Sequence, residues 1–557
     1  MPSRTGLISR KSYALGGLLF IALLVWFSNL EYRHLVKTDE GRYAEISREM
    51  VQSGDWLTPR LNGLKYFEKP PLQYWMTATA YTVFGEHQWT SRLWAALTGL
   101  GAILLVFFTG RRLFGADAGL YGALALGSGL AYVLVSHINT LDMGLTFFMT
   151  LGLCGLLQAQ HPAATARGSR VWMHIAWAAL AGAVLSKGLI GVVLPGAVVV
   201  AYKLLNRDWS LLKRLHLISG SVLLLLITAP WFIAVSLANP EFFQFFFIHE
   251  HFARFLTTVH RRDEPVWYFV PLLLFGTLPW TIPMLDALVR AWKHGAARDS
   301  FSPLRFLTVW SVFIFLFFSA SHSKLPSYIA PILPALALLT GEHLSRLGAR
   351  RLFWYTVPLA LFAAVSVWLG PHLIEARSEE VKYMLFREFK EWVTAATLIW
   401  LASALLGLYL LRRARIRPAL ITLAAGALLA WQVVITGHNE FAPSNSAYHI
   451  AQQIKPWLRD DAPVYIVGMY DQTLPFYLQR TLTLVAYQDE LAFGISQEPE
   501  KWVPDLATFE QIWRAAPYAL AVVNPELYPQ LVQRGLPMQL IAEDTRRIVV
   551  RTPGTSP

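Results

Sequence analysis

Residues 393–436 read VTAATLIWLASALLGLYLLRRARIRPALITLAAGALLAWQVVIT, two long apolar segments that flank a short run rich in arginine. Each segment approaches the length, about 20 residues, that an α-helix needs to cross a hydrocarbon core of about 30 Å. Arginines in such a connection mark the cytosolic side of a membrane. The stretch therefore predicts a helical hairpin that crosses the membrane twice and turns in the cytosol.

The composition extends this pattern to the whole chain. Of its 557 residues, 55% are hydrophobic and 15% are charged, whereas ordinary soluble domains carry about 25% charged residues. An aqueous fold cannot hide so much apolar surface, which excludes a large soluble enzyme. The single cysteine, Cys154, lies in an apolar segment and excludes a disulfide framework.

Similar apolar segments recur along residues 1–437. The first, Tyr13 to Leu30, is followed by no small-residue cleavage site and is expected to remain as an uncleaved span. The others lie near residues 93–109, 120–135, 141–159, 172–185, 189–204, 217–237, 266–288, 307–319, 328–339, 353–369, 393–411 and 419–436. We therefore expect about thirteen transmembrane helices.

The connections between these segments indicate the orientation. Lys and Arg concentrate in those that an N-terminus in the cytosol places inside, such as Arg111 and Arg112 or Arg412 and Arg413. The net charge of +12 is then an orientation signal and gives no reason to expect a nucleic-acid partner. Residues 31–91 become a first outer loop, and the odd number of spans places the C-terminal region outside as well.

After residue 437 the pattern changes to short alternating segments. Strands are expected at 464–467, 483–485, 520–523 and 548–550, and helices at 447–458, 473–477, 509–515 and 526–534. Such alternation is typical of a small α/β domain. The predicted fold is thus a polytopic α-helical membrane domain, residues 1–437, followed by an outer α/β domain, residues 438–557.

Charged residues cluster in the first outer loop. It reads TDEGRYAEISREM at 38–50 and GLKYFEKPPLQYW at 63–75. Helical spacing makes Asp39 and Arg42 neighbours, and an exposed ion pair of this kind contributes only about 0 to 1 kcal/mol to stability. Facing water would account for any one of these charges, but their clustering with Glu68 and Lys69 favours a functional site.

A second set of polar residues lies at the outer ends of the predicted spans. A charge near membrane depth costs on the order of 2.5 to 3.5 kcal/mol and marks a functional site unless the side chain reaches the interface. The set comprises Asp142, Lys187, His249, Arg254, Lys324 and Tyr328. Outer cations oppose the positive-inside bias, and a bound lipid phosphate or pyrophosphate is the simplest compensation.

Cations placed beside carboxylates suit group transfer. The cations stabilise the charge on a departing phosphate, while a carboxylate orients or deprotonates the acceptor. This chemistry requires no cofactor. Glu68 and His249 nevertheless leave a bound divalent metal ion open as an alternative, because carboxylate and imidazole are both metal ligands.

Four stretches resemble a known family. They are Asp39-Glu40 with Arg42-Tyr43-Ala44, Glu68-Lys69-Pro70-Pro71-Leu72, Asp142, and Lys324-Leu325-Pro326-Ser327-Tyr328. They are similar to membrane glycosyltransferases of the GT-C class, in the branch of protein O-mannosyltransferases and bacterial lipid A aminoarabinose transferases. The Glu-Lys-Pro-Pro run and the outer α/β domain look most like the aminoarabinose transferases. Gly41 stands where many relatives carry Ala.

The resemblance implies a multi-pass protein of the bacterial inner membrane, acting as a monomer with its active site facing the periplasm. The donor would be a polyprenyl (undecaprenyl) phosphate-linked sugar, 4-amino-4-deoxy-L-arabinose, and the acceptor a lipid A phosphate, giving resistance to cationic peptides such as polymyxin. The expected catalytic residues are Asp39, Glu40 and Asp142. Arg42, Lys69, Arg254, Lys187, Lys324 and Tyr328 are expected at the donor phosphate, and Glu68 and Asp142 at the sugar.

Two alternatives stay open. A protein O-glycosyltransferase could use the same type of donor. A lipid transporter is disfavoured, because transporters commonly show paired halves with inverted hydropathy and this sequence shows none.

Overall fold

A computed structural model describes residues 16–17, 20–207, 211–253, 264–294, 301–375 and 380–553 of the chain. The contacts divide the chain into two compact units. The first consists of residues 1–32, 95–228 and 257–438, and the second of residues 33–94, 229–256 and 439–557. Two of the divisions fall inside the helices α4 (Gln88–Phe114) and α11 (Leu217–Ala238).

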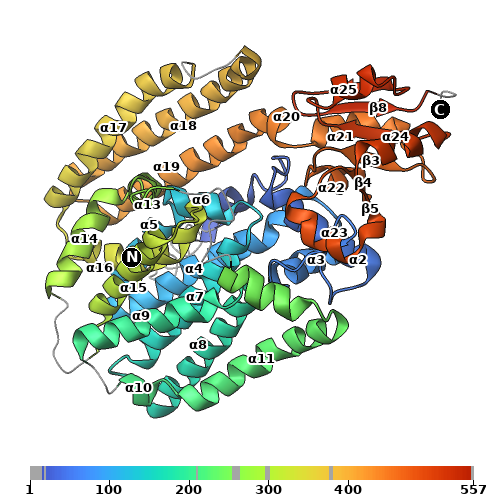
Figure 1. Ribbon diagram of the computed structural model, residues 1–557. Coiled ribbons are helices and arrows are strands. Elements are labelled where there is room, and N and C mark those ends of the chain that lie inside the picture. Colours follow the sequence, from blue (N-terminus) through green and yellow to red (C-terminus); the bar gives the residue numbers. More distant parts are fainter. Residues whose placement is uncertain are drawn as a thin grey trace. The chain divides into compact units, whose positions relative to one another are not determined.

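The first unit is built from helices packed along one another (Figure 1). Besides parts of α4 and α11, they are α5 (Ala116–Gly127), α6 (Leu130–Ser136), α7 (Leu141–Ala159), α8 (Ala166–Lys187), α9 (Ile190–Asn206), α10 (Leu211–Arg214), α13 (Phe269–Gly276), α14 (Thr281–His294), α15 (Pro303–Ala320), η2 (Pro326–Ile332), α16 (Leu333–Ser345), α17 (Ala349–Glu375), α18 (Glu380–Arg412) and α19 (Ile416–Gly437). The hairpin predicted from residues 393–436 is formed by α18 and α19, which pack against each other.

Among the described residues, 7 helices are long and apolar enough to cross a membrane, or up to 9 if each of two bent pairs is one span. The bent pairs are α5 with α6 and α13 with α14. Other predicted segments fall in α8, α9 and α16, and the first, Tyr13 to Leu30, lies only partly within the described residues. The multi-pass helical architecture is as predicted, whereas the number of thirteen spans stays a prediction.

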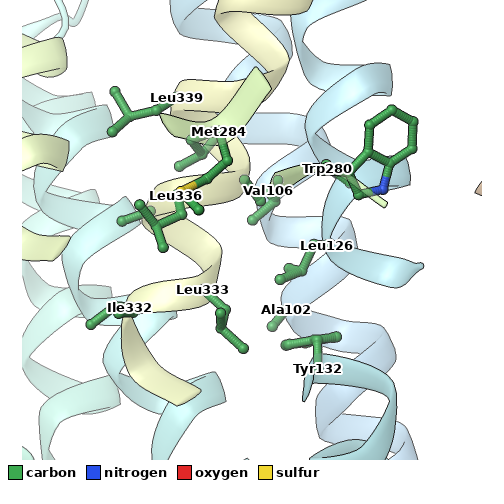
Figure 2. Close-up of a cluster of buried hydrophobic side chains, with 14 of the residues drawn as sticks. Ala102, Val106, Leu126, Tyr132, Trp280, Met284, Ile332, Leu333, Leu336 and Leu339 are labelled. Carbon is green, nitrogen blue, oxygen red and sulfur yellow. The ribbon is translucent and has the colours of Figure 1, made fainter. Parts of the chain in front are cut away.

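Close helix packing in this unit depends on glycine. A Cβ atom on Gly119 of α5 would lie 2.4 Å from the carbonyl oxygen of Phe107 in α4. One on Gly341 of α16 would lie 2.3 Å from the carbonyl oxygen of Ala118. Small residues let helix backbones approach closely where no water is available to drive association. Figure 2 shows the adjoining core, where Val106 and Leu126 from α4 and α5 face Met284 and Leu336 from α14 and α16.

The second unit combines the first outer loop, a short segment after α11 and the C-terminal region. The loop forms α2 (Asp39–Ser53), a two-stranded hairpin of β1 (Arg60–Leu61) and β2 (Leu64–Lys65), and α3 (Leu72–Phe84). Asn62 and Gly63 form its turn with φ of 55° and 78°, which matches the preference of Asn-Gly for such turns. The segment after α11 contains η1 (Gln244–Ala253).

The C-terminal region of this unit forms an α/β domain around a 6-stranded sheet of order β5-β4-β3-β6-β8-β7 (Figure 1). The strands β3 (Val464–Val467), β4 (Thr483–Val485), β5 (Trp502–Val503) and β6 (Leu520–Val523) are parallel. The strands β7 (Gln539–Glu543) and β8 (Ile548–Arg551) add an antiparallel edge. Its helices are α20 (Ala442–Asn445), α21 (Tyr448–Ile454), α22 (Leu474–Leu478), α23 (Ala492–Gln497), α24 (Leu506–Ala515) and α25 (Tyr528–Gln533). Short 3-10 helices are η3 (His438–Phe441), η4 (Lys455–Trp457), η5 (Asp489–Leu491) and η6 (Pro499–Lys501).

The strand order reverses at β3, whose neighbours are β4 and β6. Ligands of open α/β sheets bind at such a switch point, outside the carboxyl ends of the strands. Here the loop after β3 lies against α2, because a Cβ atom on Gly41 would be 2.6 Å from Thr473 and 2.7 Å from the backbone of Gln472. Helix α2 therefore packs directly on the carboxyl edge of the sheet.

Candidate functional site

Helix α2 begins with the acidic pair Asp39 and Glu40, which suits the positive end of a helix dipole. One turn later the guanidinium of Arg42 contacts the Asp39 carboxylate at 2.9 Å. Its other terminal nitrogen contacts the carboxylate of Glu490, which lies in η5 (Asp489–Leu491) after β4. Arg42 and Glu490 are 12% and 11% exposed, so this ion pair is largely shielded from water.

Glu490 is held from a second side by Gln472, whose amide donates to its carboxylate at 2.5 Å. Burial raises the pKa of the Glu490 carboxyl, and Arg42 and Gln472 counteract this rise. Gln472 and Glu490 follow β3 and β4, two adjacent parallel strands. The carboxyl edge of the sheet thus supplies Glu490, which holds the Arg42 guanidinium beside Asp39, and Gln472, which holds Glu490.

Three buried tyrosines, Tyr43, Tyr66 and Tyr74, interact electrostatically with the Arg42 guanidinium. Burial raises the pKa of the Tyr74 hydroxyl, Glu68 and Asp39 raise it further, and Arg42 lowers it. The same hydroxyl therefore senses both predicted carboxylates and the cation. Neighbouring Lys69 donates to the Glu68 carbonyl oxygen at 2.9 Å and lies 3.8 Å from its carboxylate. We call Asp39, Arg42, Glu68, Lys69 and Glu490 the α2 cluster.

Glu40, the second acidic residue of α2, has a different environment. Its two carboxylate oxygens accept hydrogen bonds from Arg92 at 2.7 and 2.8 Å, and both side chains are almost fully buried. Arg92 also donates to the carbonyl oxygens of Arg33 and His34 at 2.6 and 3.0 Å. This bidentate pair connects the start of α2 to α4. In the structure, Glu40 is thus engaged in a buried contact between two helices.

The other end of α2 is tied to the α/β domain through the β1–β2 turn. The Glu49 carboxylate accepts from the amides of Asn62 and Gly63 at 2.5 and 2.8 Å. The Asn62 side chain in turn donates to the Leu482 carbonyl at 2.7 Å and accepts from the Leu482 amide at 2.8 Å. Leu482 directly precedes β4, and Glu490, the partner of Arg42, follows it. Both ends of α2 are therefore connected to the stretch of the α/β domain that contains β4.

A second group of predicted residues comes together in the first unit. Asp142 lies in the first turn of α7, and Lys187 is the last residue of α8, positions where helix dipoles favour each charge. The Lys187 ammonium contacts the Asp142 carboxylate, and it lies 4.7 Å from the centre of the Tyr328 ring. The Ser327 hydroxyl donates to the other Asp142 oxygen at 2.9 Å. We call these four residues the η2 cluster.

The remaining predicted residues are placed as follows. Lys324 is buried and donates to the carbonyl oxygen of Glu264 at 2.7 Å. Arg254 lies outside the described residues, and His249 lies in η1 with a side chain outside the description. Among the described residues, no group of three or more His, Cys, Asp or Glu side chains is arranged to hold a metal ion. The metal pair Glu68 and His249 stays a prediction.

Sequence reasoning missed one member of each cluster, Glu490 and Ser327, and the partner of Glu40, Arg92. Arg92 stands at the start of an apolar helix, where an interfacial arginine is ordinary. Ser327 lies inside the Lys324–Tyr328 stretch, so its position was marked although its contact was not. Glu490 closely follows the predicted strand at 483–485, and the gathering of polar groups at carboxyl ends of parallel strands is a signal that could have found it.

Comparison with known proteins agrees with this architecture. The model for the aminoarabinose transferase C-terminal domain matches residues 450–552, which form most of the α/β domain. The model for dolichyl-phosphate-mannose-protein mannosyltransferase matches residues 12–246, which contain α2, α3, α7 and α8. The helical membrane unit and the α2 cluster thus define a multi-pass membrane glycosyltransferase.

Full-length relatives specify the family. The undecaprenyl phosphate-α-4-amino-4-deoxy-L-arabinose arabinosyl transferase of Erwinia tasmaniensis is 31% identical over 76% of this chain and 77% of its own length. The enzyme of the same name from Shewanella sediminis is 28% identical over 86% of this chain and 87% of its own length. The crystal structure of ArnT from Cupriavidus metallidurans bound to undecaprenyl phosphate covers 99% of this chain and 98% of its own, at 41% identity and a TM-score of 0.91. The chain belongs to the aminoarabinose transferase family.

Proposed function

We propose that this protein transfers 4-amino-4-deoxy-L-arabinose from undecaprenyl phosphate to a phosphate group of lipid A. Family membership supports the reaction class, because its relatives are named as arabinosyl transferases that use this donor. The observation that carries the proposal in this chain is the α2 cluster, where a shielded arginine and a lysine stand among carboxylates. A site with both charges suits a donor that combines a phosphate with an amino sugar.

The α2 cluster has groups available for the donor. The Nε atom of Arg42 and the hydroxyl of Tyr74 are buried and have no hydrogen-bond partner among the described residues. Buried polar groups in native proteins are nearly always paired, so such atoms call for a ligand or an ordered water. Both are donors, and phosphate or sugar oxygens are matching acceptors.

In this proposal Arg42 and Lys69 bind the undecaprenyl phosphate and stabilise the negative charge that develops when the sugar–phosphate bond breaks. Asp39 and Glu490 hold the guanidinium in place, so little reorganisation is needed during reaction. Glu68 is available to the ammonium of the amino sugar. A lipid A phosphate has a second pKa of about 6, so it is largely ionised near neutral pH and needs no strong general base.

We place the reaction at the periplasmic face of the bacterial inner membrane and expect a monomer that needs no metal. The excess of cytosolic arginine, which orients the loop at residues 31–91 outward, supports this location. Arg42 and Lys69 supply the positive charge that a metal would otherwise provide.

The test is transfer by purified protein in detergent with the synthetic donor and lipid A, with the product detected by mass spectrometry. Wild-type protein is expected to add one aminoarabinose mass to lipid A. Asp39→Asn and Lys69→Met should reduce the rate on the order of a hundredfold, whereas Lys455→Met, at an exposed lysine of the α/β domain, should not. Full activity of folded Asp39→Asn or Lys69→Met, or transfer to secreted protein instead of lipid A, would refute the proposal.

A further inference from the structure

Two consecutive residues of η2 contact both members of the Asp142–Lys187 ion pair. The Ser327 hydroxyl donates to Asp142 Oδ2 at 2.9 Å. The ring of Tyr328 faces the Lys187 ammonium at 4.7 Å, a distance typical of a cation–π contact. The turn η2 therefore holds the carboxylate with one residue and the ammonium with the next.

This arrangement engages both oxygens of the Asp142 carboxylate. Oδ1 contacts Lys187, and Oδ2 accepts from Ser327. Each oxygen of the carboxylate is therefore held from a different element, Oδ1 by the end of α8 and Oδ2 by η2. The geometry is that of a carboxylate that orients the groups around it.

The location of the pair makes its geometry sensitive to η2. Asp142 and Lys187 are 10% and 17% exposed and lie at the ends of two different helices, α7 and α8. The ion pair alone leaves the carboxylate free to rotate about its last torsion. The hydrogen bond from Ser327 removes this freedom, because it links the second oxygen to a third element of the fold.

We propose that Ser327 is a positioning residue that sets the orientation of Asp142, and that Asp142, Lys187 and Ser327 act as one unit. The inference deepens the function proposed above and rests on it. Asp142 then serves catalysis by holding the Lys187 ammonium in place. The ammonium held in this way suits an anionic group of a substrate, such as a phosphate oxygen.

The test is a double-mutant cycle of Ser327→Ala and Asp142→Asn in the lipid A transfer assay. In the wild-type background, Ser327→Ala should lower kcat on the order of tenfold and leave the KM for the donor within about twofold. In the Asp142→Asn background the same substitution should have a clearly smaller effect, because the neutral amide is a weaker hydrogen-bond acceptor than the carboxylate. Ser327→Thr keeps the hydroxyl and should restore most of the activity.

A second readout keeps the cycle informative where Asp142→Asn leaves no measurable turnover. The midpoint of thermal unfolding in detergent should fall with Ser327→Ala in the wild-type background and fall clearly less in the Asp142→Asn background. The matched control is Ser366→Ala, a half-buried serine of α17 whose hydroxyl donates to the Phe362 carbonyl of its own helix turn. It should change neither readout.

Retention of full kcat by Ser327→Ala, or equal effects of Ser327→Ala in both backgrounds, would overturn the proposal. Low activity of Ser327→Thr would also overturn the proposal, because the loss of kcat in Ser327→Ala would then be due to packing and not to the missing hydroxyl. The two levels of inference are distinguishable in this experiment. A wild-type protein that transfers no sugar refutes the proposed function, while the unfolding cycle still reports on the coupling of Ser327 to Asp142.

Discussion

Arg42 and Glu490 form an ion pair between the first turn of α2 and the carboxyl edge of the α/β sheet. Glu490 is in turn held by Gln472 from the neighbouring strand end. The α/β domain therefore contributes directly to the α2 cluster.

Replacing Glu490 by Gln should lower the rate of transfer by about tenfold to a hundredfold. A hydrogen bond to a charged group contributes about 1.5–3 kcal/mol, and each 1.4 kcal/mol corresponds to a factor of about ten in rate. Because Arg42 is proposed to bind the donor phosphate, the affinity for undecaprenyl phosphate should fall as well. This affinity is measured by titration of the purified protein. Glu500→Gln, at an exposed carboxylate nearby in sequence, is the control and should bind the donor normally.

Substitutions at Asn62 should separate the contribution of its side-chain hydrogen bonds from that of its turn conformation. Asn62→Gly removes both side-chain hydrogen bonds to Leu482 and should cost about 1–3 kcal/mol, because Leu482 loses its buried partners. Asn62→Ala should cost about 1 kcal/mol more, since alanine resists the positive φ of 55°. The measurement is the midpoint of thermal unfolding, together with the rate of protease cleavage in residues 439–553. Equal stability of the two variants would contradict the contribution of the turn geometry.

The pair of Glu40 and Arg92 should act mainly on folding. Removing one partner of a buried ion pair leaves an uncompensated charge and costs about 3–5 kcal/mol. Glu40→Gln and Arg92→Met should therefore each reduce the yield of monodisperse protein in size-exclusion chromatography. The activity of the folded Glu40→Gln fraction, per mole, should stay within a few-fold of wild type. A well-folded but inactive Glu40→Gln protein would instead support the catalytic role predicted from the sequence.

His34 should make the second unit less stable in acid. Its ring stacks on Tyr448 at 3.8 Å, and burial lowers the pKa of the imidazole to about 4. Because the ordinary value is about 6.5, the unfolded chain takes up the proton first as pH falls. The stability due to neutral His34 is complete above pH 6.5 and is lost as pH falls toward 4. The unfolding midpoint should fall over this range in wild type and in the control His87→Gln, whose ring is exposed, and fall less in His34→Gln.

Removal of metal ions should leave transfer intact. The proposed chemistry takes its positive charge from Arg42 and Lys69, so dialysis against EDTA is expected to preserve kcat. The assay is lipid A modification before and after chelation. Loss of activity that Zn²⁺ restores would contradict this expectation and would implicate the pair Glu68 and His249.

The sequence predicted the elements whose patterns are local. The strands β3, β4 and β6 lie where they were expected, because each is a short and largely buried run of mostly apolar residues. The strands β5 and β7 were missed, since β5 has 2 residues and β7 is an edge strand whose short apolar run is largely exposed. Neither carries a signal that separates it from a loop.

The site was predictable as a set of residues but not as a set of contacts. Asp142 and Lys187 were each identified from their unusual depth in the membrane, yet 45 positions separate them and nothing local indicates that they pair. Glu40 and Asp39 look equivalent in sequence. Only the fold shows that one side of the α2 start faces Arg42 and the other faces Arg92.

The close approach of Gly41 to the loop after β3 has a consequence for protein engineering. The edge of the sheet where related architectures accommodate a nucleotide is here covered by a helix of the same polypeptide. A graft of residues 439–553 alone from one family member into another would place the sheet edge of one protein against the α2 helix of the other, two surfaces that are not complementary. Chimeric enzymes with exchanged acceptor preference should therefore carry residues 33–94 from the same parent as the C-terminal region.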